Sequence, residues 1–174
     1  MNDEKGYLQV YTGNGKGKTT AALGLTLRAV GAGKKVFIAQ FAKGQLYSEI
    51  KAIENYLPGV TVRQYGLKCF IHGKPKQEDI DKARQGLREA AEAIASHQYD
   101  VIILDEANIG VFYHLFTAQE LLDAIALRQP SAEVVVTGRY ASDEIIAAAD
   151  LVTEMREIKH YYQKGVMARI GIEY

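Results

Sequence analysis

The sequence predicts an α/β fold in which helices cover both faces of a mostly parallel, doubly wound sheet. Short apolar runs alternate with segments of helical periodicity along the whole chain, and glycine or polar turn residues bound each run. This alternation is typical of βαβ units, whose right-handed crossovers place helices on both faces of the sheet. With 174 residues the chain is long enough to bury one core, so we expect a single domain over residues 1–174.

Five segments have the composition and length of strands. Four of them are rich in Val and Ile, which favour the pleated, buried environment of a sheet. The expected strands are Tyr7–Tyr11, Val36–Phe41, Val60–Tyr65, Val101–Asp105 and Val134–Gly138.

Four segments between these strands are predicted helices. Apolar residues recur at helical spacing in Thr19–Val30 and Asp79–Ile94. In the first helix we expect Leu23, Leu27 and Val30 to face the sheet. Thr117–Leu127 opens with a capping-box pattern, and Ser142–Ala149 opens with an N-cap serine followed by two acidic residues. In the second helix the expected buried face consists of Ile80, Ala83, Leu87, Ala90, Ala91 and Ile94.

Two segments interrupt the alternation of strands and helices. Gly66–Pro75 is a glycine-bounded loop with an apolar centre, which either packs on the core or faces a ligand. Leu151–Tyr174 contains two strand-like pieces around residues 161–165, for which we expect an additional hairpin.

Composition and charge exclude several classes of protein. The chain has 21 basic and 21 acidic residues, so its formal charge is zero and we expect no nucleic-acid partner. Cys69 is the only cysteine, so no internal disulfide can form, which fits a reducing compartment. No stretch approaches the ~20 apolar residues of a membrane span, and the first residues are charged. We therefore expect a cytoplasmic protein without a membrane partner.

A glycine-rich segment follows the first expected strand directly and leads into a helix. It consists of Gly13, Asn14, Gly15, Lys16, Gly17, Lys18, Thr19 and Thr20. Backbone N–H groups of such a loop converge on phosphate oxygens, the lysine adds charge and the threonine hydroxyl can bind Mg²⁺. We predict that these residues bind the phosphates of ATP. Thr12 stands where the usual motif has its first glycine, and Gly13 is expected to serve the turn instead.

Acidic and basic residues at the ends of other segments complete the expected site. Asp105 and Glu106 follow an apolar run, as in a Walker B motif, and we expect them at the end of a strand neighbouring the first one. Together with Thr19 they are the candidate Mg²⁺ residues. Arg139, after another strand, and Arg28, on the helix after the loop, are candidate phosphate contacts, with surface arginines as the alternative.

The spacing of the histidines and of the cysteine matches no zinc site, which argues against a zinc enzyme.

Two other readings of the phosphate-binding loop remain open. One is a kinase or ATPase that acts on the γ-phosphoryl group. The other is a nucleotide switch of the partition type, but that group has a signature lysine where this chain has Thr12.

Five segments together resemble the ATP:corrinoid adenosyltransferases, a P-loop family. They are YTGNGKGKTTAALG, QFAKG, VIILDE, VVVTGR and the closing ADLVTEMREIKHYYQKGVMARIGIEY, so the resemblance extends over the whole chain. It implies a P-loop NTPase-like (RecA-like) three-layer α/β/α fold. It also implies transfer of the 5′-deoxyadenosyl group of ATP to the Co(I) centre of a reduced corrinoid, with release of triphosphate, in cobalamin biosynthesis or salvage.

The resemblance also implies roles for individual residues and partners. Lys18 would stabilise the leaving triphosphate, and Phe70 would lie under the corrin and favour reduction of the cobalt. Some relatives have a tryptophan two positions further on, where this chain has His72. Mg²⁺ is the expected cofactor, ATP and the corrinoid are substrates, and an electron-donating reductase is the expected partner. We further expect a homodimer.

Overall fold

The computed structural model describes residues 5–41, 47–66 and 74–174, and its centre is a six-stranded parallel sheet. The strand order is β3-β2-β4-β5-β1-β6, and each neighbouring pair is parallel. The predicted α/β class and parallel sheet are therefore confirmed. The strands are β1 (Leu8–Thr12), β2 (Val36–Phe41), β3 (Val60–Tyr65), β4 (Val101–Asp105), β5 (Glu133–Thr137) and β6 (Leu151–Glu154).

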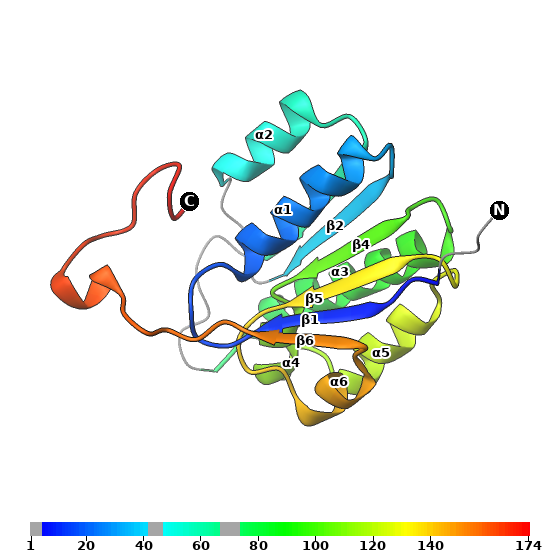
Figure 1. The fold of residues 1–174 in the computed structure, drawn as a ribbon. Coiled ribbons are helices and arrows are strands. Elements are labelled where there is room, and N and C mark those ends of the chain that lie inside the picture. Colours follow the sequence, from blue (N-terminus) through cyan, green and yellow to red (C-terminus); the bar gives the residue numbers. More distant parts are fainter. Residues whose placement is uncertain (1–4, 42–46, 67–73) are drawn as a thin grey trace.

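Helices cover both faces of the sheet and give three layers (Figure 1). On one face lie α1 (Lys18–Gly31) and α2 (Ser48–Tyr56), and on the other lie α3 (Gln77–Ala95), α4 (Ala107–Phe112), α5 (Ala118–Ala126) and α6 (Asp143–Ala148). The four predicted helices are confirmed to within two residues at each end. Helices α2 and α4 were not predicted, because both are short and α2 buries only two side chains.

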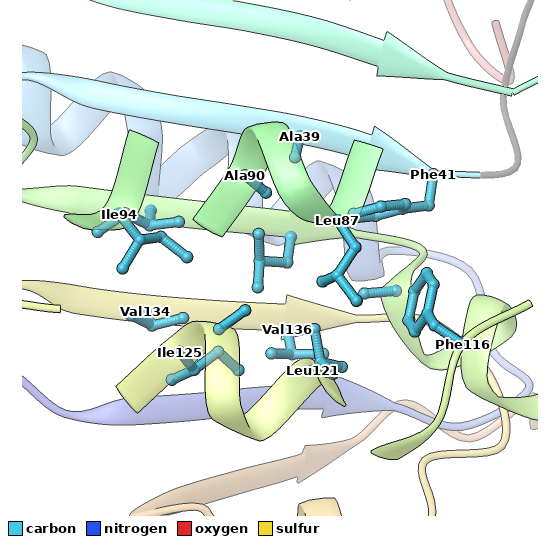
Figure 2. Close-up of a cluster of buried hydrophobic side chains, with 14 of the residues drawn as sticks. Ala39, Phe41, Leu87, Ala90, Ile94, Phe116, Leu121, Ile125, Val134 and Val136 are labelled. Carbon is cyan, nitrogen blue, oxygen red and sulfur yellow. The ribbon is translucent and has the colours of Figure 1, made fainter. Parts of the chain in front are cut away.

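The larger part of the core lies between the sheet and the helices α3 and α5 (Figure 2). Leu87 and Ile94 of α3 pack with Leu121 of α5 over the strands. At the carboxyl end of the sheet the rings of Phe41 and Phe116 meet edge to face, with centroids 5.3 Å apart. Each such side chain contributes about 1.5–3 kcal/mol when it is fully buried, so this layer anchors the ends of β2 and β4 beneath the site.

The buried face of α1 differs from the prediction in one residue, because Leu23 and Val30 pack against the core as expected but Leu27 does not. Ala22, Thr26 and Ala29 are buried, whereas Leu27 is 62% exposed. The small side chains let the helix lie close to the sheet, and Thr26 can be buried because its hydroxyl donates a hydrogen bond to the carbonyl of Ala22 at 3.1 Å. Since successive residues of a helix are rotated by about 100°, the face that contains Leu27 turns towards solvent.

The C-terminal segment does not form the predicted hairpin. Leu151–Glu154 is a parallel edge strand beside β1, and a 3₁₀ helix, η1 (Tyr161–Lys164), follows it. We call residues 155–174 the C-terminal arm. In Figure 1 it extends beyond the carboxyl ends of the strands and returns towards α1 and α2. Of the helices in the described part of the chain, none has the length and apolarity to cross a membrane.

Candidate active site

The glycine-rich loop between β1 and α1 is shaped by close contact with the start of the C-terminal arm. Gly13 and Gly17 have φ angles of +94° and +122°, in the region that favours glycine. A Cβ atom on Gly13 would also lie 2.4 Å from the carbonyl oxygen of Met155. The N–H of Gly15 donates to that oxygen at 2.7 Å. Gly13 thus serves the turn, as predicted.

Thr12 stands where the usual motif has a glycine, and its hydroxyl makes a hydrogen bond that glycine could not make. It is only 9% exposed, and its hydroxyl accepts a hydrogen bond from the N–H of Ala141 at 3.3 Å. Its carbonyl accepts a bond from the N–H of Met155 at 2.8 Å. Thr12 therefore connects the loop to the segments that follow β5 and β6.

Lys18 is folded into the centre of the loop. Its ammonium group donates hydrogen bonds of 2.7 Å to the carbonyls of Gly13 and Gly15, and the residue is 7% exposed. The first residue of α1 is also Lys18, so this charge lies at the positive end of the helix dipole. The two effects reinforce each other at the place where a polyanion would bind.

Asp105, at the end of β4, is a buried carboxylate with three hydrogen-bond donors. Its Oδ1 accepts bonds from the hydroxyls of Thr19 at 2.9 Å and Thr137 at 2.7 Å. Its Oδ2 accepts a bond from the amide of Gln40 at 3.1 Å. Thr19 therefore turns the proton of its hydroxyl towards Asp105.

Glu106 is held in an unusual backbone conformation at the start of α4. Its φ angle is +59°, and its N–H donates to the hydroxyl of Thr137 at 3.0 Å. A Cβ atom on Gly138 would lie 3.3 Å from the Glu106 carboxylate and 3.0 Å from the side chain of Asn108. Glycine at 138 therefore allows the end of β5 to approach the acidic turn.

The position of the acidic strand differs from the prediction. The sequence led us to expect Asp105 on a strand next to β1, but β5 separates β1 from β4. The hydroxyl of Thr19 nevertheless reaches Asp105, because α1 crosses the face of the sheet over β4 and β5. Thr137 of the intervening strand bonds the same carboxylate oxygen.

A cavity of about 530 Å³ opens above these groups at the carboxyl edge of the sheet. The structure brings most of the predicted residues to it, including Arg139 and Glu106. Asp105 lies behind it, in contact with Thr19. The residues that line the cavity are Asn14, Gly15, Lys16, Gly17, Lys18, Thr19, Thr20, Leu23, Tyr47, Ser48, Glu49, Glu106, Arg139, His160, Gly171, Ile172, Glu173 and Tyr174.

Two predicted residues are placed neither at this cavity nor beside it. Arg28 is on the last turn of α1, about 15 Å along the helix axis from Lys18. It lines a separate cavity with Lys34 and Glu133, so the structure does not bring it to the loop. Phe70 lies outside the described residues.

The sequence did not predict that the C-terminal arm forms a wall of the cavity. Lys16 of the loop donates to the carboxylate of Glu173 at 2.9 Å and to the carbonyl of Ile172 at 2.8 Å. Ser48 of α2 donates to the carbonyl of Tyr174 at 3.1 Å. The only available signal was the resemblance of the closing segment to the family, which does not reveal contacts across 157 positions.

Hydrogen bonding at Glu173 fixes the charge of this wall. Donors from Arg169, Tyr161 and Lys16 hold the pKa of the Glu173 carboxyl well below its usual range. Burial acts to lower the pKa of Lys16, but the hydrogen bond and the charge of Glu173, together with Tyr161, outweigh it and the pKa is raised. Both groups are charged at neutral pH, and the resulting ion pair connects the loop to the arm.

The donor set beside the loop suits Mg²⁺. Thr19, Asp105 and Glu106 offer only oxygen atoms, and Mg²⁺ is commonly held by one or two carboxylates together with substrate phosphates. Within the described ranges no group of three or more His, Cys, Asp and Glu side chains could hold a metal by itself. The residues therefore fit a cation that arrives with a phosphate chain.

Comparison with known proteins agrees with this geometry. Residues 4–174 match the family model described as ATP:corrinoid adenosyltransferase BtuR/CobO/CobP. The corrinoid adenosyltransferase of Escherichia coli (strain K12) is 37% identical over 173 residues, which are 99% of this chain and 87% of that protein. The corrinoid adenosyltransferase of Pseudomonas aeruginosa is also 37% identical, over 99% of this chain and 85% of its own. Corrinoid adenosyltransferase CobA of Salmonella typhimurium is 34% identical, with 99% and 87% covered. The chain belongs to the ATP:corrinoid adenosyltransferase family.

Proposed function

We propose that the protein transfers the 5′-deoxyadenosyl group of ATP to the Co(I) centre of a reduced corrinoid and releases triphosphate. The observation that carries this proposal is the loop around Lys18, which closes on a buried ammonium group beside a 530 Å³ cavity in a member of this family. Such a loop can hold a triphosphate as a leaving group as well as a substrate.

The reaction requires positioning more than acid–base chemistry. The cobalt of the corrinoid supplies an electron pair that forms the bond to C5′ of ATP, while the C5′–O bond breaks and its electrons leave with the triphosphate. Co(I) is a strong nucleophile, so no side chain has to remove a proton. The protein must align C5′ with the cobalt and stabilise the departing charge.

The residues of the loop supply that stabilisation. We assign Gly13 to Thr20 to the triphosphate, with Lys18 beside the developing charge and Arg139, which also lines the cavity, as a further contact. Lys18 must exchange its two carbonyl partners for phosphate oxygens when ATP binds. Because those carbonyls are neutral, the phosphate is the stronger partner for the ammonium group.

Mg²⁺ would neutralise part of the charge on the triphosphate. We assign the Thr19 hydroxyl and the Glu106 carboxylate to the metal. Asp105, whose Oδ1 already accepts two hydroxyl protons, acts mainly by orienting Thr19. This division follows from position, since Glu106 lines the cavity and Asp105 is 1% exposed.

Further parts of the proposal rest on the sequence and the family. Phe70 would contact the lower face of the corrin and favour loss of the lower axial ligand. An electron-donating reductase would supply Co(I), and the protein would act in the cytoplasm as a homodimer.

One assay separates this function from a kinase or an ATPase. The protein is incubated with ATP, Mg²⁺ and a chemically reduced corrinoid, and the products are followed by the absorbance of the cobalt–carbon bond and by anion-exchange chromatography. We expect equal amounts of adenosylated corrinoid and triphosphate. The appearance of ADP and phosphate without a cobalt–carbon bond would refute the proposal.

A further inference from the structure

Gln40 is a buried polar residue that does not line the cavity of the proposed site. It lies near the carboxyl end of β2, begins the QFAKG segment and is 1% exposed. Its amide nitrogen donates to Oδ2 of Asp105 at 3.1 Å. Gln40 and Asp105 are register partners on neighbouring strands, so their side chains emerge on the same face of the sheet.

A second glutamine determines which way the Gln40 amide points. Gln64, the register partner of Gln40 on β3, donates from its amide nitrogen to Oε1 of Gln40 at 3.0 Å. If the Gln40 amide turned over, its oxygen would face the Asp105 carboxylate and its nitrogen would face the nitrogen of Gln64. Both contacts would be repulsive, so Asp105 and Gln64 together keep the donor of Gln40 directed at Asp105.

The Gln40 bond in turn fixes the rotation of the Asp105 carboxylate. With Oδ2 held by Gln40, Oδ1 remains directed at the hydroxyls of Thr19 and Thr137. Thr137 also accepts the N–H of Glu106. The Asp105 carboxylate therefore orients the Thr19 hydroxyl directly and, through Thr137, the backbone of Glu106. A buried carboxylate that loses a donor gains freedom to rotate and becomes more costly to keep charged.

We propose that Gln40 is a positioning residue for the metal-bearing triphosphate site, acting through Asp105, with Gln64 setting the direction of its amide. The inference rests on the proposed function, because it assumes that Thr19 and Glu106 hold Mg²⁺. It concerns how tightly the metal joins bound ATP rather than whether ATP binds.

The test measures ATP binding by calorimetry in EDTA and in Mg²⁺, without corrinoid and without turnover. Gln40→Met keeps a similar volume and removes the amide, and Gln64→Met removes only the group that orients it. Gln9→Met is the matched control. Gln9 is also a strand glutamine that donates to a carboxylate, that of Glu133, and accepts from a hydroxyl, that of Tyr11, and it lines the separate cavity.

We expect Mg²⁺ to strengthen ATP binding in the wild type, and Gln40→Met to reduce that gain about tenfold, with affinity in EDTA within about twofold of wild type. Gln64→Met should also reduce the Mg²⁺-dependent gain in ATP affinity, but by a smaller factor than Gln40→Met. Gln9→Met should leave that gain unchanged. If Gln40→Met does not fold, the Gln64→Met result decides.

Three outcomes would overturn the assignment of Gln40. In the first, Gln40→Met and Gln64→Met both leave the Mg²⁺-dependent gain in ATP affinity unchanged. In the second, Gln40→Met lowers ATP affinity equally in EDTA and in Mg²⁺. In the third, Gln9→Met reduces the gain as much as Gln40→Met does. Failure of the wild type to bind ATP more tightly with Mg²⁺ would instead refute the proposed metal site.

Discussion

The ammonium group of Lys18 is the charge whose removal should most impair the reaction. Lys18→Met keeps an unbranched side chain only one atom shorter and deletes the charge. In the free protein that charge is shared between two carbonyls at 2.7 Å, and we propose that it moves to the triphosphate when ATP binds. Methionine offers no donor to either partner, so the leaving group loses its central cation.

The structure allows the two consequences of this substitution to be separated. Loss of one electrostatic donor to a developing charge costs about 3 kcal/mol or more, roughly a hundredfold in rate. The fold loses two charge-assisted hydrogen bonds of about 1.5–3 kcal/mol each, but it no longer has to bury an ammonium group, which costs several kcal/mol. These terms oppose each other, so the melting temperature should change by only a few degrees.

The assay starts from chemically generated Co(I), so that reduction does not limit the rate, and follows formation of the cobalt–carbon bond. Lys34→Met, an exposed substitution at the separate cavity, is the control for a lost lysine. A folded Lys18→Met variant within threefold of the wild-type rate would refute the assignment of the triphosphate to this loop.

Three further substitutions test other parts of the site. Glu106→Gln keeps the shape and removes the charge, so the Mg²⁺ concentration for half-maximal rate should rise; an unchanged titration removes Glu106 from the metal site. Glu173→Gln weakens the bond to Lys16 and should raise the KM for ATP several-fold, whereas Glu157→Gln, whose partner is Gln163 within the arm, should not; equal effects would contradict a role of the arm at the loop. Phe70→Ala should slow reactions that begin from Co(II) with a reductase but spare those begun from Co(I); a parallel loss with a lowered melting temperature would indicate core packing.

Local features of the fold were predictable because local physics determines them. The bounds of β2 and β4 follow from apolar runs that are buried along their whole length, and those of β3 from a shorter stretch rich in β-branched residues. The capping box at Thr117 is present as expected, with Glu120 accepting the N–H of Thr117 at 2.7 Å. That bond holds the pKa of Glu120 below its usual value.

Features that depend on contacts between distant segments were not predictable. Leu27 has the periodicity of a buried residue, yet the close approach of α1 to the sheet through Ala22 and Ala29 turns it outward. The placement of β5 between β1 and β4 is a property of the whole sheet, and no single segment encodes it. The network of Gln40 was also not recognised, because a single glutamine in an apolar strand has no pattern of its own.

The edge strand β6 shows why the loop needs glycines beyond those that its φ angles require. All four residues of β6 are exposed, so the strand contributes little to the core and is held by backbone pairing with β1. That pairing places the carbonyl of Met155 beneath the loop, where a Cβ atom on Gly13 would lie 2.4 Å from it and one on Gly15 would lie 2.8 Å from it. Substitution of Gly15 would therefore displace the strand edge as well as the loop. The glycine-rich loop and the C-terminal segment are thus mutually dependent, although they lie at opposite ends of the sequence.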